Sequence, residues 1–371
     1  PTISFRDLTI QKRESDLVAA SFGRGFYILD DYSALREFTS DNLGKEGKLF
    51  QPRPAKWFVQ RSNIGNTGAD YYFAKNPEYG AVFTYHLSGE YTTQKAMRQK
   101  REKKLNKENK NVPFPGWDAL DAEKQELPVQ VVLTIEDEEG NVINKVKQKA
   151  SKGSHRIAWN LEHFNPFTIS MNGRSRGGGG ALATPGSYQA TLYIEDNGKI
   201  SKLDGPISFE VKPIREGVLK GATYAEYNAF RLELTSVLQE INKVQDEFNQ
   251  SKKKHKALVI ALDRSNISPG SIEPKLAELK AALAAIEKML NGSSSKDEIG
   301  ERNPSGVQRY LYNAFNGMDN SYGPTEVHKK SLSTAQSMLV KVQQQVDAIT
   351  EKTIPEIEAA LKKAEAPYIA N

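Results

Sequence analysis

Basic side chains are concentrated in one short stretch of the chain, residues 95–110, where they are close enough together to bind an anionic ligand. Eight lysines and arginines stand there beside two acids, a net charge of +6, whereas the remainder of the 371-residue chain sums to −1. The basic residues are Lys95, Arg98, Lys100, Arg101, Lys103, Lys104, Lys107 and Lys110. Such a cluster can bind nucleic acid, anionic lipid or acidic polysaccharide through its charge. One interpretation of residues 95–110 is therefore a polyanion-binding module.

The other interpretation of the basic cluster is a solvated helical or disordered insertion. Single-strand binders usually interleave aromatic residues with their cations, and this stretch has none. Its apolar residues Ala96, Met97 and Leu105 are too few to form a membrane-facing side. Both points favour the insertion, and nucleic acid is not an expected partner.

Residues typical of metal or nucleophilic catalysis are sparse. The chain has no cysteine, so disulfides and thiolate metal sites are excluded. The five histidines are scattered without HxH or HExxH spacing, and no GxSxG elbow marks a nucleophilic serine. They are His86, His155, His163, His255 and His328. We predict no catalytic, cofactor-binding or metal-binding residue in this chain.

Two further patterns could suggest a site, and each has a simpler explanation. Asp30 and Asp31 are paired carboxylates such as glycosidases use. Adjacent strand residues point to opposite faces, however, so we expect these aspartates to bond the backbone of the turn at Tyr32 and Ser33. The glycine-rich residues 173–180 lack the Lys-Ser/Thr pair of a phosphate-binding loop, and they are predicted to connect two strands.

The elements at the N-terminus are short β-strands. Apolar runs at residues 3–10, 16–21 and 26–29 are separated by turn signals, as in a sandwich or one propeller blade. The sequences Arg6-Asp7-Leu8 and Gly23-Arg24-Gly25-Phe26-Tyr27-Ile28-Leu29-Asp30-Asp31 resemble the last blade of the bacterial sortilin-like, BNR-repeat β-propeller proteins. A blade buries its faces against its neighbours, so we predict that residues 1–60 form an incomplete propeller end.

A second region, residues 70–213, shows strands with period-two alternation. Val129, Val131, Leu133 and Ile135 are expected on one face of a strand. Similar runs occur at residues 82–87, 142–149, 153–160, 188–194 and 207–211. Six or seven such strands predict an immunoglobulin-like or fibronectin-III-like β-sandwich with a basic insertion at residues 90–127. The order of these strands is also similar to the sandwich that follows the propeller in the same family.

The third region, residues 217–365, changes to helical periodicity. A Thr223-x-x-Glu226 capping box opens a heptad pattern that runs to Phe248, and three further helices follow. The last is expected to begin near Pro324-Thr325 and to kink or restart at Pro355. The basic run at residues 252–256 is interpreted as a solvated helix end. Four narrow apolar seams that can satisfy one another predict an antiparallel helical bundle, although one seam could instead recruit another protein.

The predicted fold is thus multidomain β plus α: a terminal propeller blade, a sandwich and a bundle. No apolar run is long enough to span a bilayer. The resemblance implies a secreted, cell-surface or periplasmic bacterial protein in which this chain is a non-catalytic accessory region. Its expected partners are a missing N-terminal propeller portion or a second chain, and a protein or glycan ligand. The alternative is part of a glycoside hydrolase whose active site lies in propeller blades absent from this chain.

Overall fold

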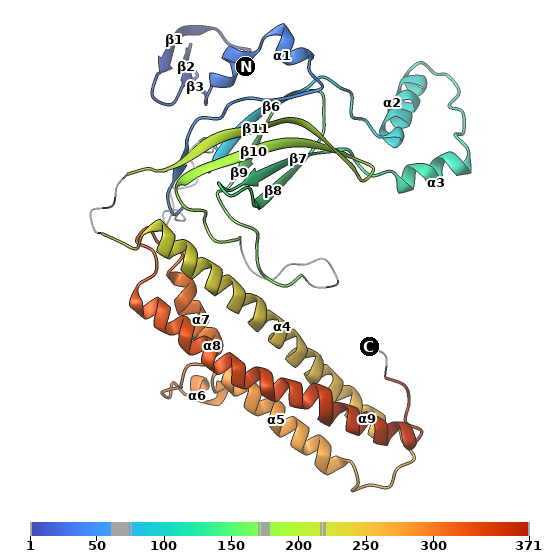
Figure 1. The fold of residues 1–371 in the computed structure, drawn as a ribbon. Coiled ribbons are helices and arrows are strands. Elements are labelled where there is room, and N and C mark those ends of the chain that lie inside the picture. The colour runs from blue at the N-terminus through green and yellow to red at the C-terminus, as the bar shows by residue number, and fades with distance from the viewer. Residues whose placement is uncertain are drawn as a thin grey trace. The chain divides into compact units, whose positions relative to one another are not determined.

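A computed structural model describes residues 2–60, 74, 76–169, 171, 179–215, 217 and 220–369. Helices form 42% of the chain and strands 24%, which confirms the predicted mixture of β-sheets followed by helices. The chain divides into two compact units. One comprises Pro1–Phe164 with Leu182–Glu216, and the other comprises Asn165–Ala181 with Gly217–Asn371. We describe each unit by itself (Figure 1).

The N-terminal unit begins with a small antiparallel sheet in the order β1-β2-β3. Its strands are β1 (Phe5–Gln11), β2 (Asp16–Ser21) and β3 (Phe26–Leu29). Two tight turns join them, and the turn residues Ser15, Gly23 and Gly25 all have positive φ. Two short helical elements, η1 (Ser33–Glu37) and α1 (Ser40–Gly44), follow. The three predicted N-terminal strands are therefore present.

Eight further strands form two sheets in the same unit. The strands are β4 (Gly47–Leu49), β5 (Ala55–Trp57), β6 (Ala81–Leu87), β7 (Gln130–Glu136), β8 (Val142–Lys149), β9 (Gly153–Trp159), β10 (Gly186–Asp196) and β11 (Lys199–Pro213). One sheet has the order β5-β11-β10-β7-β8, and the other has the order β4-β6-β9. All neighbours are antiparallel except β5 and β11, which pair in parallel. Strands β4 and β5 have no counterpart among the predicted strands, because each has only three residues.

The two sheets share one apolar core. Phe83 of β6 meets Phe209 of β11 edge to face, with ring centroids 5.0 Å apart. Trp159 of β9 packs in the same way against Tyr188 and Phe209 at 5.4 and 6.1 Å. Edge-to-face contacts of this kind add to the free energy of burial. The centre of the core is therefore aromatic and comes from both sheets.

Strand β7 is buried on both faces. Its Val131, Leu133 and Ile135 are fully buried, as expected for one face. Val132 and Thr134, which alternate with them, are also buried. β7 lies between β10 and β8, and the register places the side chains of Tyr193 and Lys147 on either side of Val132. Neighbouring strands therefore help to cover the second face of β7.

A helical hairpin interrupts this unit between β6 and β7 (Figure 1). It consists of α2 (Gln94–Lys107) and α3 (Trp117–Gln125). The predicted insertion at residues 90–127 thus contains two helices. The hairpin positions the basic cluster.

The second unit is helical. Its elements are α4 (Tyr224–Asp263), α5 (Glu273–Asn291), α6 (Ser294–Glu298), α7 (Val307–Asn316), α8 (Glu326–Asp347), the π-helical turn η2 (Ala348–Thr353) and α9 (Ile354–Lys363). The predicted capping box at Thr223 and Glu226 is present, with the Glu226 amide 3.2 Å from Thr223 Oγ1. Helix α9 restarts at Ile354, directly before Pro355, as the proline predicts.

The predicted apolar seams of the helices meet in one core. Tyr227, Phe230 and Leu234 of α4 are buried in it, together with Leu283 of α5 and Leu339 of α8. The seams satisfy one another within the chain, as expected. Among the helices that the structure describes, none is long and apolar enough to cross a bilayer.

The basic run at residues 252–256 corrects one expectation. It lies inside α4, which continues to Asp263, and is not a helix end. Leu258 and Ala261 extend the buried seam beyond the run, so packing sustains the helix there. Of the glycine-rich segment 173–180, residues 173–178 lie outside the described residues.

Candidate functional site

The predicted polyanion-binding residues lie on and just after α2, and the structure fixes how this helix begins. Thr93 caps it by accepting a hydrogen bond from the amide of Ala96 at 3.2 Å. The amide of Gln94 donates to both carboxylate oxygens of Glu126, at 3.0 and 2.7 Å. A carboxylate at a helix N-terminus satisfies exposed amides and is favoured by the helix dipole. Glu126 follows α3, so this contact ties the base of the hairpin together.

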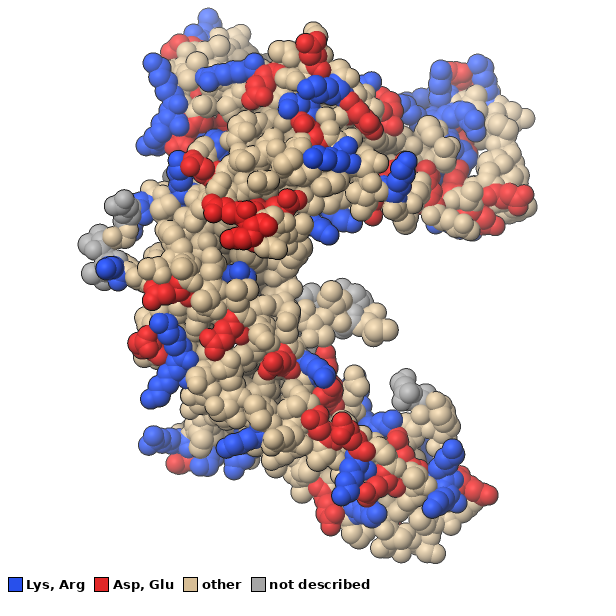
Figure 2. Space-filling model, viewed as in Figure 1, with Lys and Arg blue, Asp and Glu red and all other residues tan. Residues whose placement is uncertain are grey.

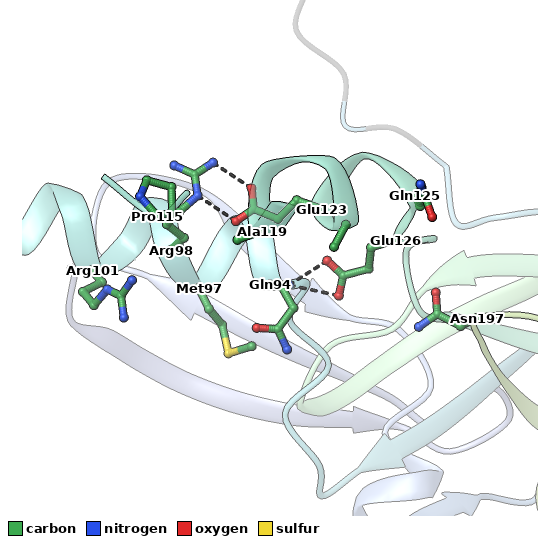
Figure 3. Close-up of a pocket in the computed structure, with 11 residues that line it drawn as sticks. Gln94, Met97, Arg98, Arg101, Pro115, Ala119, Glu123, Gln125, Glu126 and Asn197 are labelled. Atoms are coloured by element: carbon green, nitrogen blue, oxygen red, sulfur yellow. Dashed lines mark hydrogen bonds and ion pairs between the residues drawn. The ribbon is translucent and has the colours of Figure 1, made fainter. Parts of the chain in front are cut away.

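A second contact joins the two helices through Arg98. Its Nε and Nη2 donate to the two carboxylate oxygens of Glu123 on α3, at 2.7 and 2.8 Å. Its Nη1 donates to Glu102 at 2.7 Å, and Figure 3 shows the paired bonds to Glu123. The hydrogen bonds to Glu123 and Glu102 raise the pKa of Arg98, and Arg98 lowers the pKa of Glu123. A forked guanidinium–carboxylate pair fixes geometry as well as charge, so Arg98 fastens α2 to α3.

Of the seven remaining cations, Lys95 and Arg101 are exposed on α2, and the other five divide into two groups. Lys110 pairs with Glu108 at 2.8 Å, outside the helix. Among the residues that the structure describes, no carboxylate pairs with Lys100, Lys103, Lys104 or Lys107. These four are exposed, and helical spacing places them on one side of α2, away from Arg98. Figure 2 shows basic side chains gathered over α2 and acidic ones over α3. The hairpin therefore presents an unneutralised lysine face, here named the α2 lysine face.

A cavity of about 870 Å³ lies between α2 and α3. Figure 3 shows Met97 and Arg101 of α2 and Ala119 of α3 at its wall, with Pro115 from the connecting segment. Arg98 and Glu123 line the same cavity, and each neutralises the charge of the other. The cavity combines the apolar Met97, Pro115 and Ala119 with the amides of Gln94, Gln125 and Asn197 and the Arg101 guanidinium.

The hairpin also holds an aromatic pair that the sequence interpretation missed. Phe114 and Trp117 pack edge to face, 5.1 Å between centroids, and are 62% and 75% exposed. The two rings belong to the sequence Pro113-Phe114-Pro115-Gly116-Trp117, whose prolines and glycine predict a turn. The proline and glycine spacing does form a connection, but it leaves both rings in solvent. Exposed aromatic rings are enriched in binding surfaces.

A second candidate surface is the small sheet β1–β3, which leaves most of its apolar side chains in solvent. Phe26 is 74% exposed and Leu8 is 60% exposed. Phe5, Ile10, Ile28 and Leu29 are exposed as well, so only Ala19 of the three strands is buried. The register places Leu8, Ile10 and Leu29 on one face of the sheet and Phe26 and Ile28 on the other, so both faces carry exposed apolar side chains, which often mark a contact site. We name these exposed residues the β1–β3 apolar surface.

Polar contacts connect this sheet to the rest of its unit. Arg53, just before β5, donates to the Glu14 carbonyl oxygen at 2.9 Å and lies 3.2 Å from its carboxylate. Lys56 Nζ lies 2.5 Å from the same carboxylate, and Arg156 of β9 donates to the carbonyl oxygen of Asp31 at 2.8 Å. The hydrogen bond from Lys56 is the largest cause that lowers the pKa of Glu14. Glu14 is therefore the acid at the centre of this connection.

The paired carboxylates Asp30 and Asp31 lie in the turn after β3. Asp31 Oδ1 accepts hydrogen bonds from the amide and the hydroxyl of Ser33, at 3.2 and 2.5 Å. The Asp31 amide donates to Asp16 at 2.9 Å. The predicted backbone bonding at Ser33 is confirmed for Asp31. Its carboxylate orders the turn.

Within the described residues, no group of three or more histidines and acids could hold a metal ion. His255 Nε2 contacts the Leu276 carbonyl oxygen at 3.2 Å, and His328 Nδ1 accepts from the amide of Thr325 at 3.0 Å. Both rings therefore connect or cap helices. No family model, curated protein or solved structure compared with this chain matches it. The geometry above is therefore the basis for assigning a function.

Proposed function

We propose that this chain is a non-catalytic accessory region of a bacterial sortilin-like, BNR-repeat propeller protein, located at the cell surface, in the periplasm or outside the cell. In this proposal β1–β3 is the last blade of the propeller, and its apolar surface packs against neighbouring β-structure. The observation that supports it is the exposure of Phe26, Leu8 and Ile28 in a sheet too small to have a core of its own. Three strands need a covered apolar face to be stable.

The same proposal assigns β4–β11 to an immunoglobulin-like or fibronectin-III-like sandwich. Two sheets around a shared aromatic core, with Trp159 at its centre, are consistent with that class. Arg53 and Arg156 then act as braces, because both reach from the sandwich to the backbone of the blade. The bracing would fix the last blade relative to the sandwich and leave further surfaces for a protein or glycan.

Cross-linking mass spectrometry on the natively produced protein tests the docking. Lys12 lies in the exposed turn between β1 and β2. We expect it to cross-link to propeller peptides outside residues 1–371, whether in the same polypeptide or in a second one. A native preparation that contains no covering β-structure would overturn the proposal.

Variants of the chain itself test whether β1–β3 is the docking surface. We expect Phe26→Ser with Ile28→Thr to lower the binding of bis-ANS, a dye that fluoresces on apolar surfaces, and to reduce self-association. Phe114→Ser with Trp117→Ser is the matched control, because it removes exposed rings from the hairpin instead. Equal dye binding by wild type and the β3 variant would exclude β1–β3 as the docking surface.

A second candidate function, polyanion binding, is favoured by the α2 lysine face. We expect replacement of Lys100, Lys103, Lys104 and Lys107 by Gln to move elution from immobilised heparin to lower salt. Salt screens such contacts, so the wild-type retention should fall steeply with ionic strength. The control replaces Lys145, Lys149, Lys199 and Lys202, which are also exposed and whose replacement changes the net charge by the same amount. Equal elution of both variants would refute a specific role for α2.

The glycosidase alternative places the active site in blades that this chain does not contain. It rests on the family label alone, since Asp31 is engaged in a turn. Robust hydrolysis of a glycoside by residues 1–371 would revive it and would contradict the accessory proposal.

A further inference from the structure

A groove of about 560 Å³ lies between α4 and α5 in the helical unit. On α4 its wall follows Lys252, His255 and Val259, and on α5 it follows Leu283 and Glu287. These positions are three or four residues apart, so each set lies along one side of its helix. The basic run that the sequence interpretation assigned to a helix end is thus one wall of this groove.

The floor of the groove is apolar and held in place. Leu283 is almost fully buried, whereas Val259 is 37% exposed and Ala284 beside it faces solvent. His255 Nε2 contacts the Leu276 carbonyl oxygen of α5 at 3.2 Å, which joins the two walls. The volume lies within the range of small-molecule sites, which are mainly apolar with a few placed polar groups.

The charges at the rim are not balanced. Lys252 is neutralised by Glu287 at 2.8 Å and also lies 4.7 Å above the ring of Phe248. Lys256 and Lys280 line the same groove from opposite helices. Neither has a carboxylate partner among the residues that the structure describes. Two cations therefore stand beside an exposed apolar floor.

We infer that this groove binds a small amphipathic anion. Its apolar chain lies on Val259, Leu283 and Ala284, and its carboxylate or phosphate head group pairs with Lys256 and Lys280. An inorganic anion would leave the floor exposed, and an uncharged apolar molecule would leave both lysines unpaired. Only a ligand with both parts complements the groove. The inference concerns the helical unit and does not depend on the docking of β1–β3.

Isothermal titration calorimetry on the full chain tests this, with dodecanoate and dodecyl phosphate below their micelle concentrations. We expect saturable binding at one site for at least one of the two, and their relative affinities identify the preferred head group. Dodecyltrimethylammonium, which has the same chain and the opposite charge, and acetate, which has no chain, should not bind. Failure of both anions to bind, or equal binding of the cation, would overturn the inference.

Three variants locate the binding. Lys256→Gln with Lys280→Gln should weaken it at least tenfold, and Val259→Glu, which places a negative charge on the floor, should abolish it. Lys330→Gln with Lys341→Gln is the matched control, since both lysines are exposed on α8. Circular dichroism melting checks that each variant folds. If the groove variants bind as the wild type and the control do, the ligand sits elsewhere and the inference fails.

Discussion

The sheet β1–β3 and the two-sheet body of the same unit use similar strands but place their apolar residues differently. Phe83 in β6 has no exposed surface, whereas Phe26 in β3 is 74% exposed. Both lie in antiparallel strands, so secondary structure alone does not account for the difference. The two-sheet body has a second sheet to cover its inner face, whereas among the described residues no side chain of β1–β3 belongs to a large apolar core. A strand becomes part of a core when another layer covers it.

The largest expected effect comes from truncating these two phenylalanines. Phe83→Ala should lower the free energy of unfolding by about 3–5 kcal/mol, because it leaves a cavity in a packed core. Phe26→Ala should change it by less than about 0.5 kcal/mol. All three tryptophans lie in the N-terminal unit, so urea unfolding followed by tryptophan fluorescence reports on that unit. A loss at Phe26 equal to that at Phe83 would show that β1–β3 already has a core.

Two glycines sharpen the same comparison. Gly80, before β6, has a φ of +106°, and a Cβ there would lie 1.9 Å from the Trp159 carbonyl oxygen. Gly25, before β3, has a φ of +75° and open space around it. Gly25→Ala should cost only the left-handed strain, about 1–2 kcal/mol, whereas Gly80→Ala should cost more because it also displaces β9. The same urea titration measures both. Equal losses would mean that the close approach at Gly80 can relax.

The connection at Glu14 is expected to have a moderate effect. Arg53→Gln removes the hydrogen bonds from Arg53 to Glu14, which should lower the local stability of the sheet by about 1 kcal/mol. Amide hydrogen exchange in β2 should therefore become about fivefold faster. Arg13→Gln is the control, because Arg13 contacts the same carboxylate at 3.0 Å but its own side chain is 81% exposed. Exchange in β7 should not change in either variant. Unchanged exchange in β2 would show that Arg53 does not hold the sheet.

The smallest effect concerns acid. Because the folded state lowers the pKa of Glu14, its contribution to stability is present above the unfolded pKa of about 4.3 and is lost as pH falls through the folded value. The urea midpoint of the wild type should therefore decline more between pH 6 and pH 3 than that of Glu14→Gln. Parallel declines would assign the acid sensitivity to other carboxylates.

Local patterns in the sequence determined much of this protein. The 3–4 spacing from Tyr227 to Phe248 specified a buried helical seam, and Thr223 with Glu226 specified where that helix begins. Period-two runs specified most strands, because one face of a strand must be apolar to be buried. Pro355 marked the restart at α9, since proline limits the preceding turn.

Other features depended on contacts between residues far apart in the chain. The three-residue strands β4 and β5 exist because they pair with β6 and β11, and no periodicity can appear over three residues. The sequence identified eight basic residues as one cluster, but only the tertiary structure divided Arg98, engaged by Glu123, from the α2 lysine face. Composition counts charges along the chain, whereas neutralisation depends on which carboxylate lies within hydrogen-bonding distance. The groove between α4 and α5 could not be predicted from the sequence for a similar reason, because its two walls come from different helices that meet only in the folded protein.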